Sequence, residues 1–162
     1  MKDTIDIENV YDTYSRRLYN ISLRIIGNSA EAEEIMHDSL LQWWRFRRKN
    51  EIRDLPGWLA SVCIRKSIDR IRERNRWCGF LECYEDPAQE ESPEEMEYNI
   101  ADILMALSGL PDNYRVIVSL HLFEGFDYQE IAQITGCKEN TIRSLYMRGR
   151  QKLAEAIKNK RL

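Results

Sequence analysis

The sequence predicts an all-α protein made of two small helical domains that a flexible acidic linker joins. Gly and Pro are sparse, at 7 and 4 of 162 residues, while 31% of the residues are charged, a composition typical of helical proteins. Apolar residues recur at helical spacing in two separate stretches, and no alternating apolar–polar run indicates a strand. Residues 77–98 lose this periodicity and hold 8 acidic residues but no Lys or Arg. We therefore expect domains at residues 1–76 and 99–162.

The N-terminal domain is expected to contain three helices. The apolar face of the first consists of Val10, Tyr14, Leu18, Ile21 and Ile25. Gly27 ends this helix, and either Asn28 or Ser29 can cap the next one. Pro56 fits the first turn of the third helix, where its missing N–H costs little. Trp58 is expected in the core, because large aromatic side chains are mostly buried.

Helical periodicity returns in the C-terminal domain, from Ile100 onward. Pro111 and Asp112 are expected to open one helix that Gly125 ends, and two more are expected around 128–135 and 139–157.

The last two predicted helices have the spacing of a helix-turn-helix. Ala132 allows a second helix to approach closely, and Gly136 suits a turn that needs a left-handed backbone. Ile142 and Leu145 are expected to face inward. The alternative is an ordinary helical hairpin, but an outward arginine pair, Arg143 and Arg148, favours DNA binding. The residues expected to contact DNA are Lys138, Asn140, Thr141, Arg143, Ser144, Met147 and Arg148, with Lys138 and Thr141 on phosphate.

The formal net charge of −3 conceals two basic blocks. Residues 45–76 carry 11 basic and 4 acidic residues, and residues 138–162 carry 8 and 2. Residues 77–102 carry 9 acidic residues and none that are basic. Solvated helix faces usually mix the two signs, so these blocks favour two surfaces for a polyanion.

Several classes of function are not expected. No apolar run suits a signal peptide or a bilayer span, which predicts a cytoplasmic protein without membrane insertion. The four cysteines, Cys63, Cys78, Cys83 and Cys137, are expected to be reduced, and any redox or metal role of Cys78 and Cys83 is left open. We find no zinc-ligand spacing, phosphate-binding glycine loop or nucleophile–base pair. We therefore expect no metal, no cofactor and no catalytic site.

The C-terminal segment LPDNYRVIVSLHLFEGFDYQEIAQITGCKENTIRSLYMRGRQKL resembles region four of the extracytoplasmic-function (ECF) sigma factors, in the sigma-70 family. The resemblance implies binding to the minus-thirty-five promoter element. The family usually has Arg where this chain has Leu145, and Ala where it has Gly149. The glycine is expected to weaken its helix by about 0.5–1 kcal/mol relative to Ala.

Two N-terminal segments resemble sigma region two. AEAEEIMHDSLLQWW is similar to the helix that binds the clamp of the largest polymerase subunit, although His37 stands where Gln is common. The polymerase contacts implied are Glu34, His37, Asp38, Leu41, Gln42 and Arg45. LPGWLASVCIRKSIDRIRERNR resembles the segment that melts and recognises the minus-ten element, and the preceding loop, residues 50–55, would capture a flipped base. The contacts implied are Arg53, Asp54, Arg65, Lys66, Asp69, Arg70, Arg72, Arg74 and Arg76.

The resemblance implies an alternative RNA polymerase sigma factor that directs promoter recognition and transcription initiation. Its partners would be core RNA polymerase, through the clamp and the flap, promoter DNA and an anti-sigma factor. We expect a monomer when the protein is free, with an acidic linker that limits DNA binding in the absence of polymerase. The alternative is a free-standing helix-turn-helix regulator, which would bind duplex DNA without polymerase, usually as a dimer.

Overall fold

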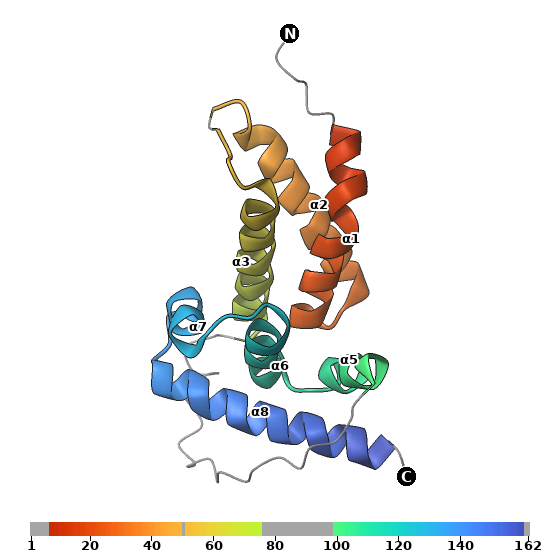
Figure 1. Cartoon of the computed structure of the whole chain (residues 1–162), viewed down its shortest axis with the longest axis vertical. Coiled ribbons are helices and arrows are strands. Elements are labelled where there is room, and N and C mark those ends of the chain that lie inside the picture. Colours follow the sequence, from red (N-terminus) through yellow and green to blue (C-terminus); the bar gives the residue numbers. More distant parts are fainter. Residues whose placement is uncertain (1–6, 50, 76–98, 161–162) are drawn as a thin grey trace. The chain divides into compact units, whose positions relative to one another are not determined.

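The computed structural model describes residues 7–49, 51–75 and 99–160, and the regular structure in these ranges is helical (Figure 1). The helices are α1 (Ile7–Ile26), α2 (Ser29–Phe46), α3 (Leu55–Asn75), α5 (Ile100–Ser108), α6 (Asp112–Val118), the π-helical segment η1 (Ser119–Phe123), α7 (Tyr128–Thr135) and α8 (Glu139–Lys160). The all-α prediction is confirmed. The chain divides into two units, residues 1–70 and 71–162, with the division inside α3. The predicted linker, residues 77–98, lies outside the described ranges, so the proposed domain limits stay a prediction.

Local capping signals set the helix boundaries of the first unit. Helix α1 ends before Gly27, whose φ of 73° is in the left-handed region that favours glycine. Asn28 is the N-cap of α2, and its side chain accepts a hydrogen bond from a first-turn N–H at 3.0 Å. Asp54 caps the N-terminus of α3 in the same way, because its carboxylate accepts a hydrogen bond from the N–H of Gly57 at 3.2 Å. Pro56 lies in the first turn of α3, as predicted.

The core of the first unit lies between its three helices. Its fully buried side chains include Leu18, Ile21, Ile25, Ile26, Ile35, Leu59 and Ile68. Small polar groups join α1 to α3 within this core: Ser67 Oγ lies 3.0 Å from Ser22 Oγ, and the thiol of Cys63 donates to the carbonyl of Leu18 at 3.3 Å. Because these groups are buried and bonded to each other, they fix the position of α3 along α1.

The second unit contains the predicted helix-turn-helix, formed by α7 and α8. Gly136 follows α7 with a φ of 73°, which is the left-handed turn expected from the sequence. Ile142 and Leu145 are 0% and 2% exposed, so the inward face predicted for α8 is confirmed. Asp127 and Glu130 form a capping box at the start of α7.

Gly149 has a packing role that its sequence context did not indicate. A Cβ atom at this position would lie 2.7 Å from Cγ2 of Val118 and 3.3 Å from Cβ of Tyr114. Helix α8 therefore passes α6 so closely at this point that a methyl group has no space. The glycine weakens the helix locally, but it also permits this close contact.

We expect Gly149→Ala to lower the free energy of unfolding by about 1–3 kcal/mol, despite the better helix propensity of Ala. The reason is that Val118 is only 1% exposed and cannot move without disturbing α6. Gly109→Ala is the matched control, because its Cβ would meet a single backbone oxygen at an ordinary 3.6 Å. Urea unfolding of both variants checks this expectation, and equal stability would contradict it.

None of the helices in the described ranges combines the length and the apolar composition that a membrane span requires. Within the same ranges, no three His, Cys, Asp or Glu side chains gather closely enough to hold a metal ion. Cys63 is buried and Cys137 is half-buried, while Cys78 and Cys83 lie outside the described residues.

Candidate nucleic-acid interface

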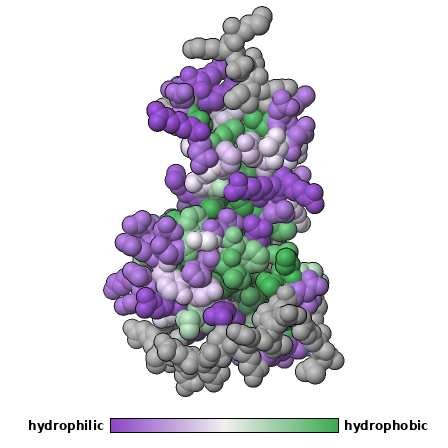
Figure 2. Space-filling view, in the orientation of Figure 1, coloured by the Kyte–Doolittle hydropathy of each residue, from purple (hydrophilic) through white to green (hydrophobic). Residues whose placement is uncertain are grey.

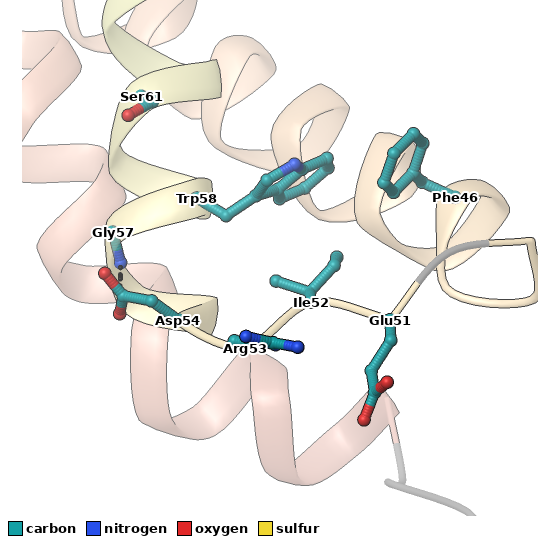
Figure 3. Close-up of a pocket in the computed structure, with 8 residues that line it drawn as sticks. All are labelled: Phe46, Glu51, Ile52, Arg53, Asp54, Gly57, Trp58 and Ser61. Atoms are coloured by element: carbon teal, nitrogen blue, oxygen red, sulfur yellow. Dashed lines mark hydrogen bonds between the residues drawn. The ribbon is translucent and has the colours of Figure 1, made fainter.

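A pocket of about 530 Å³ opens in the first unit, where the loop before α3 meets the C-terminal end of α2 and the N-terminal turns of α3 (Figure 3). It is lined by Phe46, Glu51, Ile52, Arg53, Asp54, Gly57, Trp58 and Ser61. The rings of Phe46 and Trp58 stack, with 5.3 Å between their centroids and 27° between their planes. Figure 3 shows Ile52 pointing toward Trp58, while Glu51 points away from the aromatic pair. The pocket therefore has an apolar wall beside a charged loop.

Trp58 lies in this pocket, so its predicted place in the core was wrong. The side chain is half-buried, and its partner Phe46 is 37% exposed. Leu59 and Cys63 form the buried face of α3, and Trp58 lies one residue outside it. Two partly exposed aromatic rings beside a polar loop provide a surface on which a nucleobase can stack.

Several predicted DNA contacts continue from the pocket along one side of α3. Trp58, Ser61, Arg65, Asp69 and Arg72 follow one another at intervals of three or four residues, which places them on one helix face. Arg65 and Asp69 are exposed. Arg72 is half-buried, and its Nη2 donates to the carbonyl oxygen of Thr135 at 2.8 Å, so its guanidinium packs within the second unit.

The other predicted minus-ten residues are distributed around this face. Arg53 and Asp54 line the pocket itself. Lys66 is half-buried beside the face. Arg74, near the end of α3, is exposed, and its Nη2 lies 3.2 Å from Oδ2 of Asp112 in the second unit. Arg76 lies outside the described residues.

Arg70 does not share the face that begins at Trp58. Its Nη1 lies 3.3 Å from Oε2 of Glu34 and 3.6 Å from Oε1 of Glu31, both on α2. The hydrogen bond to Glu34 is the main reason that the pKa of Arg70 is raised above its usual value. The structure thus places Arg70 against α2, away from the face that begins at Trp58, and its role in DNA binding stays a prediction.

The predicted polymerase contacts are all exposed on α2. They are Glu34, His37, Asp38, Leu41, Gln42 and Arg45. Leu41 is 45% exposed, so this charged surface has an apolar side chain near its middle. Tyr11 of α1, which sequence analysis missed, extends the surface, because its ring stacks on His37 with 5.8 Å between centroids.

The predicted recognition face of α8 is formed in part. Asn140 and Arg143 are exposed there, and Ser144 and Met147 are half-buried. The Arg143 side chain is 60% exposed, its Nη2 lies 3.7 Å from Glu139, and its guanidinium lies 5.5 Å from the ring centroid of Tyr128. Just before and at the start of this helix, Lys138 is exposed and Thr141 is half-buried.

Arg148 departs from the predicted outward arginine pair. The side chain is half-buried, and its Nη2 atom is removed from solvent. It lies five residues after Arg143, which places it on a different side of α8. Arg143 therefore remains the exposed arginine near the start of the recognition face.

An aromatic cluster of His121, Tyr128 and Tyr146 packs beside the recognition face. The ring of His121 stacks on Tyr128 at 4.8 Å and meets Tyr146 edge-on at 4.3 Å between centroids. His121 Nδ1 lies 2.7 Å from the carbonyl oxygen of Phe126. Burial raises the pKa of Tyr146 above its usual value. Because Tyr128 also lies under Arg143, this cluster links α7 to the part of α8 that carries the exposed arginine.

Helix α5 presents apolar side chains to solvent. Ile100, Leu104 and Met105 are 69%, 38% and 58% exposed. Figure 2 shows the corresponding apolar surface over the part of the second unit that carries α5. A patch of this kind is typical of a protein–protein contact.

Comparison with known proteins assigns both units to one family. A family model described as Sigma-70 region 2 matches residues 10–77, and one described as Sigma-70, region 4 matches residues 100–153. The chain belongs to the sigma-70 family. Within this family, the sequence is similar to ECF RNA polymerase sigma factors from several bacteria. These matches support the interpretation of the chain as an alternative RNA polymerase sigma factor.

The relatives of this sigma factor include proteins of different lengths. ECF RNA polymerase sigma factor SigE of Mycolicibacterium smegmatis is 30% identical over 150 residues, which are 89% of this chain and 58% of the relative. This chain thus spans little more than half the length of SigE. SigM of Bacillus subtilis is 23% identical over 153 residues and is covered to 92% of its length. The fold resembles the sigma factor RpoE of Bartonella quintana, solved with the anti-sigma factor NepR, with a TM-score of 0.59, 22% identity and coverage of 93% and 96% of the two chains.

Proposed function

We propose that this sigma factor binds core RNA polymerase through α2, holds the melted minus-ten element on its first unit and recognises the minus-thirty-five element with α8. One observation carries the proposal: an aromatic pocket large enough for a nucleobase lies at the start of the helix face formed by Trp58, Ser61, Arg65 and Asp69. A base pocket flanked by the exposed cationic side chains of Arg53 and Arg65 fits a single strand of nucleic acid better than a duplex.

The first unit would capture a flipped base of the minus-ten element. Flipping costs a few kcal/mol, and stacking on an aromatic side chain returns about 1–3 kcal/mol per base. The 5.3 Å between the rings of Phe46 and Trp58 is too short to admit a base, which needs about 7 Å, twice the 3.4 Å step of stacked bases. The base would therefore stack on the exposed side of this pair, within reach of polar groups on Arg53 and Asp54.

The second unit would bind the minus-thirty-five element in the major groove. Arg143 is the candidate for recognition of guanine, whose O6 and N7 both accept hydrogen bonds. Asn140, Ser144 and Met147 lie near it on the same helix, while Lys138 and Thr141 would contact phosphate.

Protein partners would use two further surfaces. The exposed side of α2, centred on Leu41, is proposed to bind the clamp of the largest polymerase subunit, and the apolar side of α5 the flap. An anti-sigma factor is proposed as a regulator, since RpoE of Bartonella quintana was solved with one. The protein would act in the cytoplasm, as a monomer when free, without a cofactor or a catalytic site of its own.

Transcription with purified core polymerase tests this function. We expect the chain to join the core and start transcription at new positions in a library of genomic fragments. Leu41→Asp should lower the affinity for core polymerase by at least about tenfold. The substitution replaces the large apolar side chain near the middle of the α2 surface with a charged one. Asn20→Asp adds the same charge to an exposed site on α1 and should have little effect.

Two results would overturn the proposal. A chain that neither binds core polymerase nor changes where transcription starts is not acting as a sigma factor. Tight binding of a dimer to duplex DNA without polymerase would favour the free-standing helix-turn-helix regulator instead.

A further inference from the structure

We infer that the end of α2 carries a phosphate-binding site for single-stranded DNA, formed by Arg48 and Lys49 beside the base pocket. The inference rests on the proposed function. It assigns individual phosphate contacts within the basic block of residues 45–76, for which the sequence predicted only a polyanion surface. It concerns a short basic segment, Arg47, Arg48 and Lys49, that directly follows the pocket residue Phe46.

The backbone places these cations within one turn of the pocket. Phe46 ends α2 and lines the pocket, and the N–H of Lys49 donates to the carbonyl of Phe46 at 3.1 Å. The turn is therefore closed, so the backbone of Arg48 and Lys49 stays within one turn of the pocket residue Phe46. Both side chains are exposed.

Basic residues at a helix C-terminus often serve only to offset the helix dipole. Arg47 already has this role here, because its guanidinium donates to the carbonyl of Trp44 and lies 3.2 Å from the centroid of the Trp44 ring. Arg48 and Lys49 add positive charge beyond what this helix end requires. Burial, and then the charge of Arg48, lower the pKa of Arg47 below its usual value, so the cations disfavour one another. A bound anion would relieve this repulsion.

The neighbouring pocket indicates which anion fits. A nucleobase on the exposed side of the Phe46–Trp58 pair brings its own phosphates to the rim of the pocket, within the reach of long cationic side chains. Arg65 of α3 would contact the strand further along. Arg48 and Lys49 would thus hold the backbone on the α2 side of the captured base, without any preference for its identity.

The test uses holoenzyme assembled with the full chain and promoter DNA that is single-stranded across the minus-ten element. We expect the double variant Arg48→Gln, Lys49→Gln to bind this DNA about 3- to 10-fold more weakly at 0.1 M salt. The slope of log affinity against log salt concentration should become shallower by about 1.4, which is 0.7 for each of two lost phosphate contacts. The order of preference among bases at the captured position, and the affinity for core polymerase, should stay unchanged.

A matched variant and two further results make the test decisive. Arg16→Gln with Arg17→Gln removes the same charge from exposed sites on α1 and should leave the salt slope unchanged. If the Arg48, Lys49 variant leaves the slope unchanged while Trp58→Ala removes base preference, the phosphate site is refuted and the proposed function stands. If the variant loses affinity for core polymerase instead, the basic segment is a protein contact and the inference is wrong. If no variant of the pocket or of this segment alters DNA binding, the proposed function fails as well.

Discussion

Trp58→Ala is expected to slow open-complex formation at a duplex promoter by about 5- to 150-fold. The variant removes one ring of the aromatic pair in the pocket, and with it about 1–3 kcal/mol of stacking on the captured base. Each 1.4 kcal/mol corresponds to a factor of ten. Because that stacking offsets the cost of flipping the base, its loss should lower the rate at which the open complex accumulates. Heparin-resistant complexes, counted over time at fixed salt, provide the measurement.

An abasic site at the captured position separates base stacking from a purely structural role of Trp58. Without a base to hold, wild-type holoenzyme and the Trp58→Ala holoenzyme should bind a pre-melted promoter equally well. Trp58→Phe keeps an aromatic ring and should recover most of the activity on ordinary DNA. An equal loss on abasic and ordinary DNA would mean that Trp58 supports the fold of the loop and does not stack on a base.

Sequence patterns predicted those features of the fold that depend on neighbours along the chain. The left-handed turn at Gly136, the cap before α2 and the inward side of α8 all follow from spacing within about one or two helical turns. Hydrophobic periodicity determines which side of a helix is buried, and capping residues determine where the helix begins. These interactions are local, so a single sequence contains enough information to place them.

The features that the sequence did not indicate concern side chains whose neighbours are distant in sequence. Trp58 pairs with Phe46 on another helix, and Arg70 finds Glu34, which is 36 residues away. Gly149 is required because α6 passes close to it, a contact that helix propensity does not describe. A basic residue on a basic helix looks the same in sequence whether it faces DNA or a carboxylate. Only the packing of the helices distinguishes the two cases.

The recognition helix shows the same distinction between arginines. The sequence predicts both Arg143 and Arg148 as outward-facing DNA contacts. In the structure Arg143 is exposed, whereas Arg148 has a guanidinium nitrogen removed from solvent. The DNA contact most sensitive to substitution in the second unit should therefore involve Arg143. Arg148→Ala is expected to affect stability together with binding, so it is a poor probe of promoter recognition.

Arg143→Ala is expected to cost about 1–3 kcal/mol at the cognate promoter, a loss of roughly 5- to 150-fold in affinity. The reason is that the arginine is exposed, and that Glu139 and the ring of Tyr128 hold it near the start of α8, where recognition helices meet base edges. The loss should be confined to promoters with guanine at the contacted position, since the variant loses a hydrogen-bonding pair specific to that base.

Lys138→Ala should instead weaken binding to all promoters alike and make the slope of log affinity against log salt concentration shallower by about 0.9. Footprinting titrations of holoenzyme on promoters that differ at single minus-thirty-five positions measure both effects. Uniform weakening by Arg143→Ala would place this side chain on the phosphate backbone and remove it from sequence recognition.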